Sequence, residues 1–290
     1  MTKRINRRPK PGVYPGVAFD VYRSWPYVNN SSLSHAVRSA AHYRHAIDTR
    51  RDVDTPSKRF GRLVDAWASG DLSNLVVFDG PEWQAMKNQY ARPTSTREWE
   101  HRAGKLRTKY GVSDVFTGDE FSAAKAVWQA IVDDPGAFAL LDGAQRQVSL
   151  VWDDPATKLR CKARIDFLSV MGIVDLKTTY DASQFRGSIQ RFGYHRQMAF
   201  YRRGLSLVGG GELHRTYLIA AETREPYGCQ WAPLSQRALE RGEEEVDVAL
   251  TRIARALEAD RWDNYSSPAE WDIPSGDTIT VWMEGEERTW

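Results

Sequence analysis

Cysteine is nearly absent from this chain, since only Cys161 and Cys229 occur among 290 residues. Two thiols do not make the disulfide framework of a small secreted protein, and they cannot supply the four thiolates of an iron–sulfur cluster. No segment approaches the ~20 consecutive apolar residues that a membrane span requires. No Gly-x-x-x-x-Gly-Lys-Ser/Thr loop occurs, so a fused ATP-driven motor is not expected. These absences favour a soluble, cytoplasmic protein.

A strong excess of one charge is also missing. The 40 basic and 38 acidic residues give a net charge of +2, which does not by itself indicate a nucleic-acid partner. The 41% hydrophobic and 27% charged residues are typical of a globular protein. Residues 1–16 are basic, contain three prolines and lack an apolar run, so they are expected to form a disordered arm rather than a signal peptide. We expect one domain over 17–262 and a tail without assigned structure over 263–290.

Periodicity predicts a helical N-terminal part over 28–145 and a catalytic core over 146–262 that contains a meander of strands. Together these elements predict an α+β fold with a mixed central sheet flanked by helices. Helices are expected over Ser31–Arg50, Pro56–Ser69 (capped by Thr55), Trp83–Tyr110, Glu120–Leu141, Ser183–Leu205 and Leu234–Ala259, and strands over Val148–Trp152, two runs within 161–179, Arg215–Ala221 and Tyr227–Trp231.

Two carboxylates and a lysine are expected to share one face of a hairpin within residues 161–179. If Met171-Gly172 is its two-residue loop, Asp166 lies opposite Lys177 and Asp175 lies opposite Leu168. Cross-strand partners and residues two apart on a strand project to the same side, so the three charged groups lie together. A solvated polar face with a weak ion pair is the alternative, but the strands are otherwise largely apolar.

This arrangement suits metal-dependent hydrolysis of a phosphodiester. Carboxylates hold Mg²⁺, with Mn²⁺ as a possible substitute, and the cation lowers the pKa of a bound water and stabilises developing negative charge. Asp166 and Asp175 are the predicted ligands, together with the main-chain carbonyl of Leu176. Lys177 is predicted to position or deprotonate the attacking water and to neutralise charge in the transition state.

The segment after the hairpin adds further candidates. Gln197 and Tyr201 are spaced i, i+4 and therefore lie on one helix face, where they contact a phosphate or the metal shell, or else form an ordinary buried polar pair. Residues 182–211 contain five arginines and no acid, which is typical of a surface that binds a polyanion. These arginines are Arg186, Arg191, Arg196, Arg202 and Arg203.

These motifs resemble those of a known family. Asp166, Asp175-Leu-Lys177 and the segment from Gly193 to Tyr201 resemble the PD-(D/E)XK nuclease superfamily, and within it the RecE-type (exodeoxyribonuclease VIII-like) exonucleases. The likeness extends to Asn30-Ser-Ser-Leu and to Gly61-Arg-Leu-Val-Asp65, and it covers roughly residues 28–262.

The resemblance implies a magnesium-dependent exonuclease of phage or bacterial origin that degrades one strand of linear duplex DNA from its 5′ end. It also implies a ring-shaped oligomer and a single-strand annealing protein as partner. The family usually has histidine where this chain has Asp65, which can still ligate a hard cation. The family's acidic residue on the preceding strand is here Gln147, a weaker ligand for magnesium.

Two further arginines are candidates for DNA binding. Arg164, by strand parity, either contacts the scissile phosphate or pairs with a carboxylate. Arg38, with its neighbours His42, Arg44 and His45, either holds a 5′ phosphate or belongs to a solvated helix face. A catalytically silent DNA-binding module and an endonuclease of the same fold remain as competing hypotheses.

Overall fold

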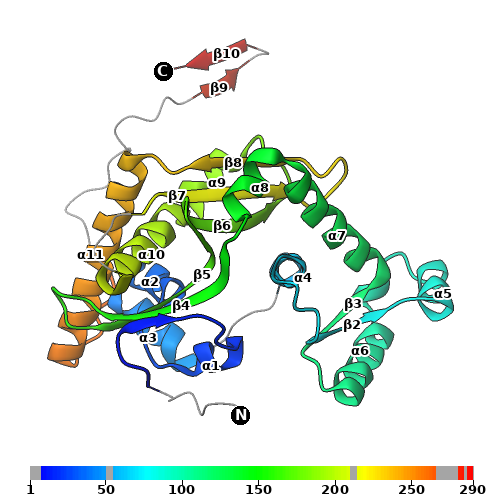
Figure 1. Ribbon diagram of the computed structural model, residues 1–290, viewed down its shortest axis with the longest axis horizontal. Coiled ribbons are helices and arrows are strands. Elements are labelled where there is room, and N and C mark those ends of the chain that lie inside the picture. The colour runs from blue at the N-terminus through cyan, green and yellow to red at the C-terminus, as the bar shows by residue number, and fades with distance from the viewer. Residues whose placement is uncertain (1–7, 50–54, 210–213, 266–279, 284–285, 290) are drawn as a thin grey trace.

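A six-stranded mixed sheet forms the centre of the computed structural model, which describes residues 8–49, 55–209, 214–265, 280–283 and 286–289 (Figure 1). The strand order is β1-β4-β5-β6-β7-β8; β6 and β7 are parallel, and the other neighbours are antiparallel. The predicted α+β class with a mixed sheet is therefore confirmed. The strands are β1 (Gly12–Tyr14), β4 (Gln145–Asp153), β5 (Arg160–Ser169), β6 (Gly172–Thr179), β7 (Thr216–Glu222) and β8 (Cys229–Pro233).

Helices cover both faces of this sheet. On one face, α2, α10 and α11 contribute Leu33, Met198 and Leu250 to a hydrophobic cluster with the strands. On the other face, α4 and α7 contribute Leu63 and Val127 to a second cluster, which α8 completes. The helices are α1 (Phe19–Ser24), α2 (Asn30–Arg38), α3 (Ala40–Thr49), α4 (Pro56–Ser69), α5 (Pro81–Gln89), α6 (Arg97–Tyr110), α7 (Gly118–Asp133), α8 (Pro135–Leu141), α9 (Phe185–Arg191), α10 (Tyr194–Gly209) and α11 (Gln236–Ala259), with a 3₁₀ turn at Pro93–Ser95.

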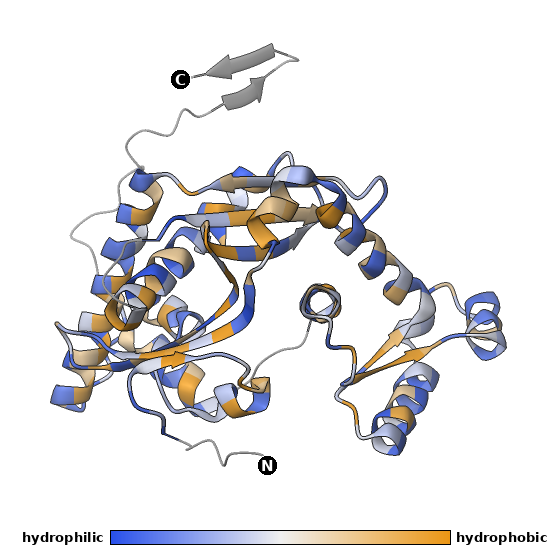
Figure 2. Ribbon diagram, viewed as in Figure 1, coloured by the Kyte–Doolittle hydropathy of each residue, from blue (hydrophilic) through white to orange (hydrophobic). Residues whose placement is uncertain are grey.

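A smaller unit projects beyond α4 and α7 (Figure 1). Its strands β2 (Leu75–Phe78) and β3 (Asp114–Thr117) are parallel, and α5 and α6 pack Trp83 and Trp99 into a separate core with them. Figure 2 shows the hydrophobic colour on both strands and a mainly hydrophilic α5. The predicted helical N-terminal part over 28–145 therefore also contains two strands, which were not predicted because four-residue strands are too short to show a period in the sequence.

Four of the long helices predicted from periodicity are each divided in two. Ser39 adopts an extended backbone, and its Oγ accepts a hydrogen bond from the His42 amide at 3.1 Å. Such capping residues and helix breakers end one helix and begin the next, while the hydrophobic period continues across the break. The interruptions lie at Ser39, Pro93, Asp134 and Gly193. The helix over Pro56–Ser69 and its Thr55 cap are confirmed.

The segment before α2 is attached to the sheet. Within the arm that was expected to be disordered, β1 pairs with Ser149–Val151 of β4, so that prediction is wrong for residues 12–14, while residues 1–7 lie outside the described part. In the tail, β9 (Thr280–Met283) and β10 (Glu286–Thr289) form an antiparallel pair. Among the described residues, no helix combines the length and apolarity needed to cross a membrane.

Lys162 fastens this N-terminal segment to β5. It is 3% exposed, and its Nζ donates hydrogen bonds to the carbonyls of Tyr22 (2.9 Å), Arg23 (3.3 Å) and Trp25 (2.7 Å). Tyr22 and Arg23 belong to the last turn of α1, where carbonyls lack partners within the helix.

Replacing Lys162 with methionine should therefore lower the free energy of unfolding by at least about 2 kcal/mol, because three carbonyls lose a charged donor. Chemical denaturation measures this value. Lys158→Met is the control, since Lys158 is exposed. A loss no larger than that of the control would show that Lys162 is dispensable.

Candidate active site

The β5–β6 hairpin differs from its predicted register by two residues. Its loop is Val170-Met171, and the pairs are Ser169–Gly172, Leu168–Ile173 and Phe167–Val174. One further step in this register sets Asp166 opposite Asp175 rather than opposite Lys177. A shift of the strand register by an even number of residues leaves every side chain on its original face of the sheet. Asp166, Asp175 and Lys177 therefore still share one face, as predicted.

The alternation of β5 breaks beside Asp166. Ala163 and Ile165 lie in the cluster under α10, whereas Phe167 lies in the opposite cluster. Gln147, which would face Asp166 on β4, is absent from the ladder and has a φ of +53°. This is a left-handed conformation that a glutamine rarely adopts. Such local distortions redirect side chains and are common beside active sites.

Asp175 is the most enclosed member of the site, with 1% of its surface exposed. Its Oδ1 accepts a hydrogen bond from Nε2 of Gln197 at 2.8 Å, and its Oδ2 forms an ion pair with Lys177. The same Gln197 amide donates to the Tyr201 hydroxyl at 3.1 Å. The predicted i, i+4 pair on α10 therefore faces the β6 carboxylate, and its amide group holds that carboxylate in place.

Asp166 and Asp65 complete the group of charges. Oδ2 of Asp166 accepts a hydrogen bond from the Leu176 amide at 3.3 Å. Burial, followed by the charges of Asp175 and Asp65, raises the pKa of Asp166 well above its usual value. Burial also raises the pKa of Asp65 to about 6, against the opposing effect of Lys177.

The Lys177 ammonium is the cation within this group. Burial lowers its pKa, but the charges of Asp175 and Asp166 and the hydrogen bond to Asp175 outweigh burial and raise it overall. Lys177 therefore stays protonated at neutral pH in this arrangement. The predicted role in positioning water and neutralising negative charge is compatible with a protonated Lys177, whereas the predicted removal of a proton from water would require a neighbouring cation to lower its pKa.

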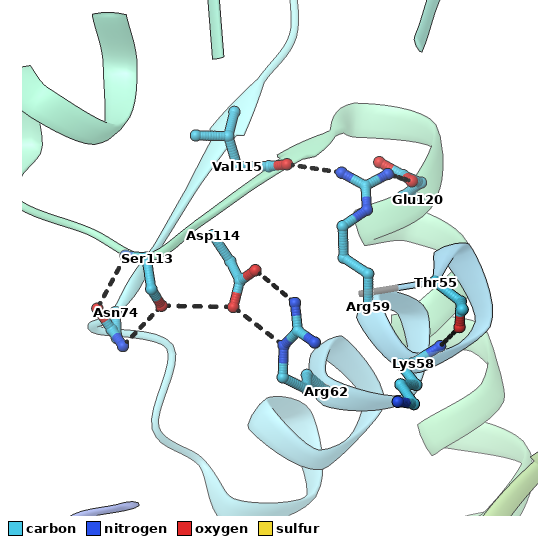
Figure 3. Close-up of polar contacts among 9 residues, drawn as sticks. All are labelled: Thr55, Lys58, Arg59, Arg62, Asn74, Ser113, Asp114, Val115 and Glu120. Atoms are coloured by element: carbon cyan, nitrogen blue, oxygen red, sulfur yellow. Dashed lines mark hydrogen bonds and ion pairs between the residues drawn. The ribbon is translucent and has the colours of Figure 1, made fainter. Parts of the chain in front are cut away.

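Helix α4 carries Asp65, and two arginines fix it to the smaller unit (Figure 3). Arg59 donates to the Val115 carbonyl at 2.9 Å and pairs with Glu120 of α7. Arg62 pairs with Asp114 of β3 at 2.8 Å. The smaller unit thus sets the position of the helix whose next turn supplies the third carboxylate.

The donor set of Asp65, Asp166 and Asp175 suits a hard divalent cation. All three donors are oxygens, and their mutual repulsion is only partly offset by Lys177. As the side chains lie, no three His, Cys, Asp or Glu groups of the described residues are close enough together to hold a metal ion. Asp175 instead contacts Lys177 and Gln197. A bound cation would neutralise part of the Asp175 charge, which Lys177 alone neutralises in this pair.

The prediction of a basic surface on α10 is wrong for Arg196, Arg202 and Arg203, which lie against acidic side chains of α11. Arg196 is 8% exposed and pairs with Glu245 of α11 at 2.8 Å. Arg203 forms an ion pair with Glu243, and Arg202 lies 3.8 Å from the same carboxylate. The acids that neutralise these arginines lie about 40 to 50 residues further along the chain, so counting charge within residues 182–211 missed them. We leave Arg196 out of the proposed DNA surface.

The remaining DNA-binding candidates are dispersed. Arg191 and Arg38 are exposed at the ends of α9 and α2. Arg164 is partly buried and donates to Oε1 of Gln147 at 2.6 Å and to the Val17 carbonyl at 2.7 Å. Gln147 and the main chain occupy its guanidinium, so the predicted pairing with a carboxylate is not formed among the described residues, and the contact with the scissile phosphate stays a prediction. Gln147, expected at a metal-ligand position, directs its side-chain oxygen to Arg164.

Tyr194 is a residue of the site that sequence reasoning missed. The Lys177 ammonium lies 5.0 Å from the centroid of its ring. Tyr194 stands within the Gly193–Tyr201 motif, but nothing in the spacing distinguishes a ring above the lysine from a core aromatic.

Comparison with known proteins places this geometry in a family. The model of the "PDDEXK-like domain of unknown function (DUF3799)" matches residues 31–271. The chain belongs to this PDDEXK-like family. A structure from Eubacterium rectale named "Putative exonuclease" shares its fold, with a TM-score of 0.57 and 17% identity over 82% of this chain and 84% of that chain. The predicted PD-(D/E)XK superfamily is thereby confirmed.

Two other comparisons add little. A phage related exonuclease from Haemophilus somnus 129PT aligns over 81% of this chain and 96% of its own, with 11% identity and a TM-score of 0.30. That score is too low to carry an argument. A comparison with curated proteins gives no match. Family and fold of this PDDEXK-like chain support a nuclease, and the RecE-type subgroup stays a prediction.

Proposed function

We propose that this PDDEXK-like protein is a magnesium-dependent exonuclease of the RecE type, which hydrolyses one strand of linear duplex DNA from its 5′ end and leaves 3′ single-stranded overhangs. The observation that carries the proposal is the contact of the buried Asp175 with Lys177 and Gln197, beside Asp166 and Asp65. Burying like charges together destabilises a fold, so such a cluster is typical of a functional site.

Each residue has a stated task in this proposal. Asp166 and Asp175, with Asp65 and the Leu176 carbonyl, would hold Mg²⁺ or Mn²⁺, which supplies an activated water and neutralises charge on the phosphate. Lys177 orients the attacking water and stabilises the negative charge of the transition state. Gln197 keeps the Asp175 carboxylate in place, and the Tyr201 hydroxyl accepts a hydrogen bond from the same amide.

The proposal includes partners. Double-stranded DNA ends are the substrate, a single-strand annealing protein would receive the overhang, and a ring-shaped oligomer would enclose the duplex. Arg191, Arg38 and Arg164 are the proposed DNA contacts, and the first two are exposed. Phage recombination or bacterial repair in the host cytoplasm is the proposed setting.

One incubation tests this function. Linear duplex, nicked circular and closed circular DNA are mixed with the protein and Mg²⁺ or Mn²⁺, with and without EDTA, and 5′-phosphorylated ends are compared with 5′-hydroxyl ends. Metal-dependent loss of linear DNA alone is expected. Cutting of closed circles would instead indicate an endonuclease, and metal-independent binding without cleavage would indicate a silent DNA-binding module.

A further inference from the structure

A row of aromatic rings leads from Lys177 to the surface. The Tyr194 ring, 5.0 Å from the Lys177 ammonium, stacks on Phe185 with 5.6 Å between centroids and an angle of 19°. On the same ring, Phe192 lies 5.8 Å away at 36°. Phe192 is 55% exposed, so the row ends in an apolar ring in contact with water.

An arginine side chain lies beside the exposed end of the aromatic row. The Arg191 guanidinium lies 5.4 Å from the Phe192 centroid. The same combination recurs at the end of β6, where Tyr180 is 70% exposed and the Arg224 guanidinium lies 4.6 Å from its ring. Packing does not explain the exposed Phe192, since neither Phe192 nor Arg191 belongs to a hydrophobic cluster of the described residues.

We propose that Tyr194, Phe192 and Arg191 form a stacking platform for an unpaired base next to the cleaved phosphate. This inference rests on the proposed nuclease function and narrows its substrate: the site takes a DNA strand whose terminal bases are unpaired.

A DNA base exposes different surfaces in paired and in unpaired strands. A base inside a duplex shows only its edges in the grooves, because its faces are covered by neighbouring base pairs. Once the strand is unpaired, both faces are free to stack on aromatic rings, irrespective of sequence. The guanidinium of Arg191 adds attraction to the backbone phosphates and to the base. The aromatic row begins at the proposed catalytic lysine, so its rings lie next to the proposed position of the scissile phosphate, within reach of an adjoining unpaired base.

The test measures binding without cleavage. The full-length chain in EDTA is titrated with a fluorescent single-stranded oligonucleotide and with the corresponding blunt duplex, and the anisotropy is followed. Phe192→Ala should weaken single-strand binding roughly 5- to 100-fold, and Phe192→Trp should retain it. Phe138→Ala is the matched control, because Phe138 is an aromatic of similar exposure, 46%, on α8. Its affinity should equal that of the wild type.

A spectroscopic readout separates stacking from general loss of affinity. An oligonucleotide with 2-aminopurine near its 5′ end should change its fluorescence on binding to the wild type and to Phe192→Trp, but not on binding to Phe192→Ala. Circular dichroism checks that each variant is folded. Equal affinities and equal fluorescence changes for Phe192→Ala and Phe138→Ala would overturn the platform.

Different results would contradict the nuclease proposal and the stacking platform. If the wild type cleaves no DNA with any metal, yet binds single strands through Phe192, the nuclease proposal fails and the platform stands as a binding site. If the wild type cleaves linear DNA while Phe192→Ala binds and cleaves like the control, the platform fails and the nuclease stands.

Discussion

Replacing Lys177 with alanine should lower the rate of DNA cleavage roughly 10²- to 10⁴-fold, the range lost with a positioned proton-transfer or charge-stabilising group. The reason is local: Lys177 is the cation within the carboxylate group, it contacts Asp175, and it is mostly buried. Affinity for DNA, measured by anisotropy in EDTA, should change little, because one partly buried charge contributes little to binding a polyanion in solution.

The control for this experiment is Lys158→Ala, which removes an exposed lysine from the turn before β5. Since the Lys177 substitution leaves Asp175 buried without its cation, its thermal stability is measured beside its activity. A folded Lys177→Ala protein that cleaves at the wild-type rate would show that the lysine has no part in the chemistry.

Replacing Asp166 with asparagine should abolish cleavage and, at neutral pH without metal, stabilise the fold. Burial and neighbouring charges raise the pKa of Asp166, so its ionised form costs free energy in the folded state. For a carboxyl with a raised pKa, stability is present at low pH and is lost as pH rises toward the folded-state value. The amide keeps the shape and removes this loss. Each 1 kcal/mol gained should raise Tm by about 2–4 °C.

Adding Mg²⁺ should reverse the order of Tm between the wild type and Asp166→Asn. Under the proposal, Mg²⁺ binds to these carboxylates and neutralises them, so it should raise the Tm of the wild type more than that of Asp166→Asn. Because the pKa of Asp65 is raised to about 6, the increase in Tm caused by Mg²⁺ should depend on pH. The increase in Tm should be small at pH 5 and larger at pH 7, where protons no longer compete for the carboxylate. Asp133→Asn, an exposed carboxylate of α7, should behave like the wild type.

The parts of the site that the sequence predicted correctly share a physical reason. Strand parity brought Asp166, Asp175 and Lys177 to one face, and it tolerated a two-residue error in register because parity does not change under an even shift. Helical spacing placed Gln197 and Tyr201 together for a similar reason. Both rules depend on the regular period of one element, which a sequence displays directly.

The errors share a reason as well. Arg196 and its neighbours seemed to form a free basic surface because their acidic partners come from α11, which only the folded chain brings against α10. The break of alternation beside Asp166 depends on the left-handed backbone of Gln147, a residue that does not normally signal one. Strands β2 and β3 are too short to display a period. Each error concerns a contact or conformation that tertiary structure imposes on a locally ordinary sequence.

The central claim is that Asp166 and Asp175 hold a divalent cation beside Lys177. Crystals of the protein soaked in Mn²⁺ and measured at the manganese absorption edge test it directly, with Asp166→Asn crystals as the control. An anomalous peak in contact with both carboxylates is expected in the wild type and none in the variant, with the Lys177 ammonium still turned toward the ion. A wild-type crystal without manganese between the two aspartates, or with Lys177 turned to bulk solvent, would contradict the account.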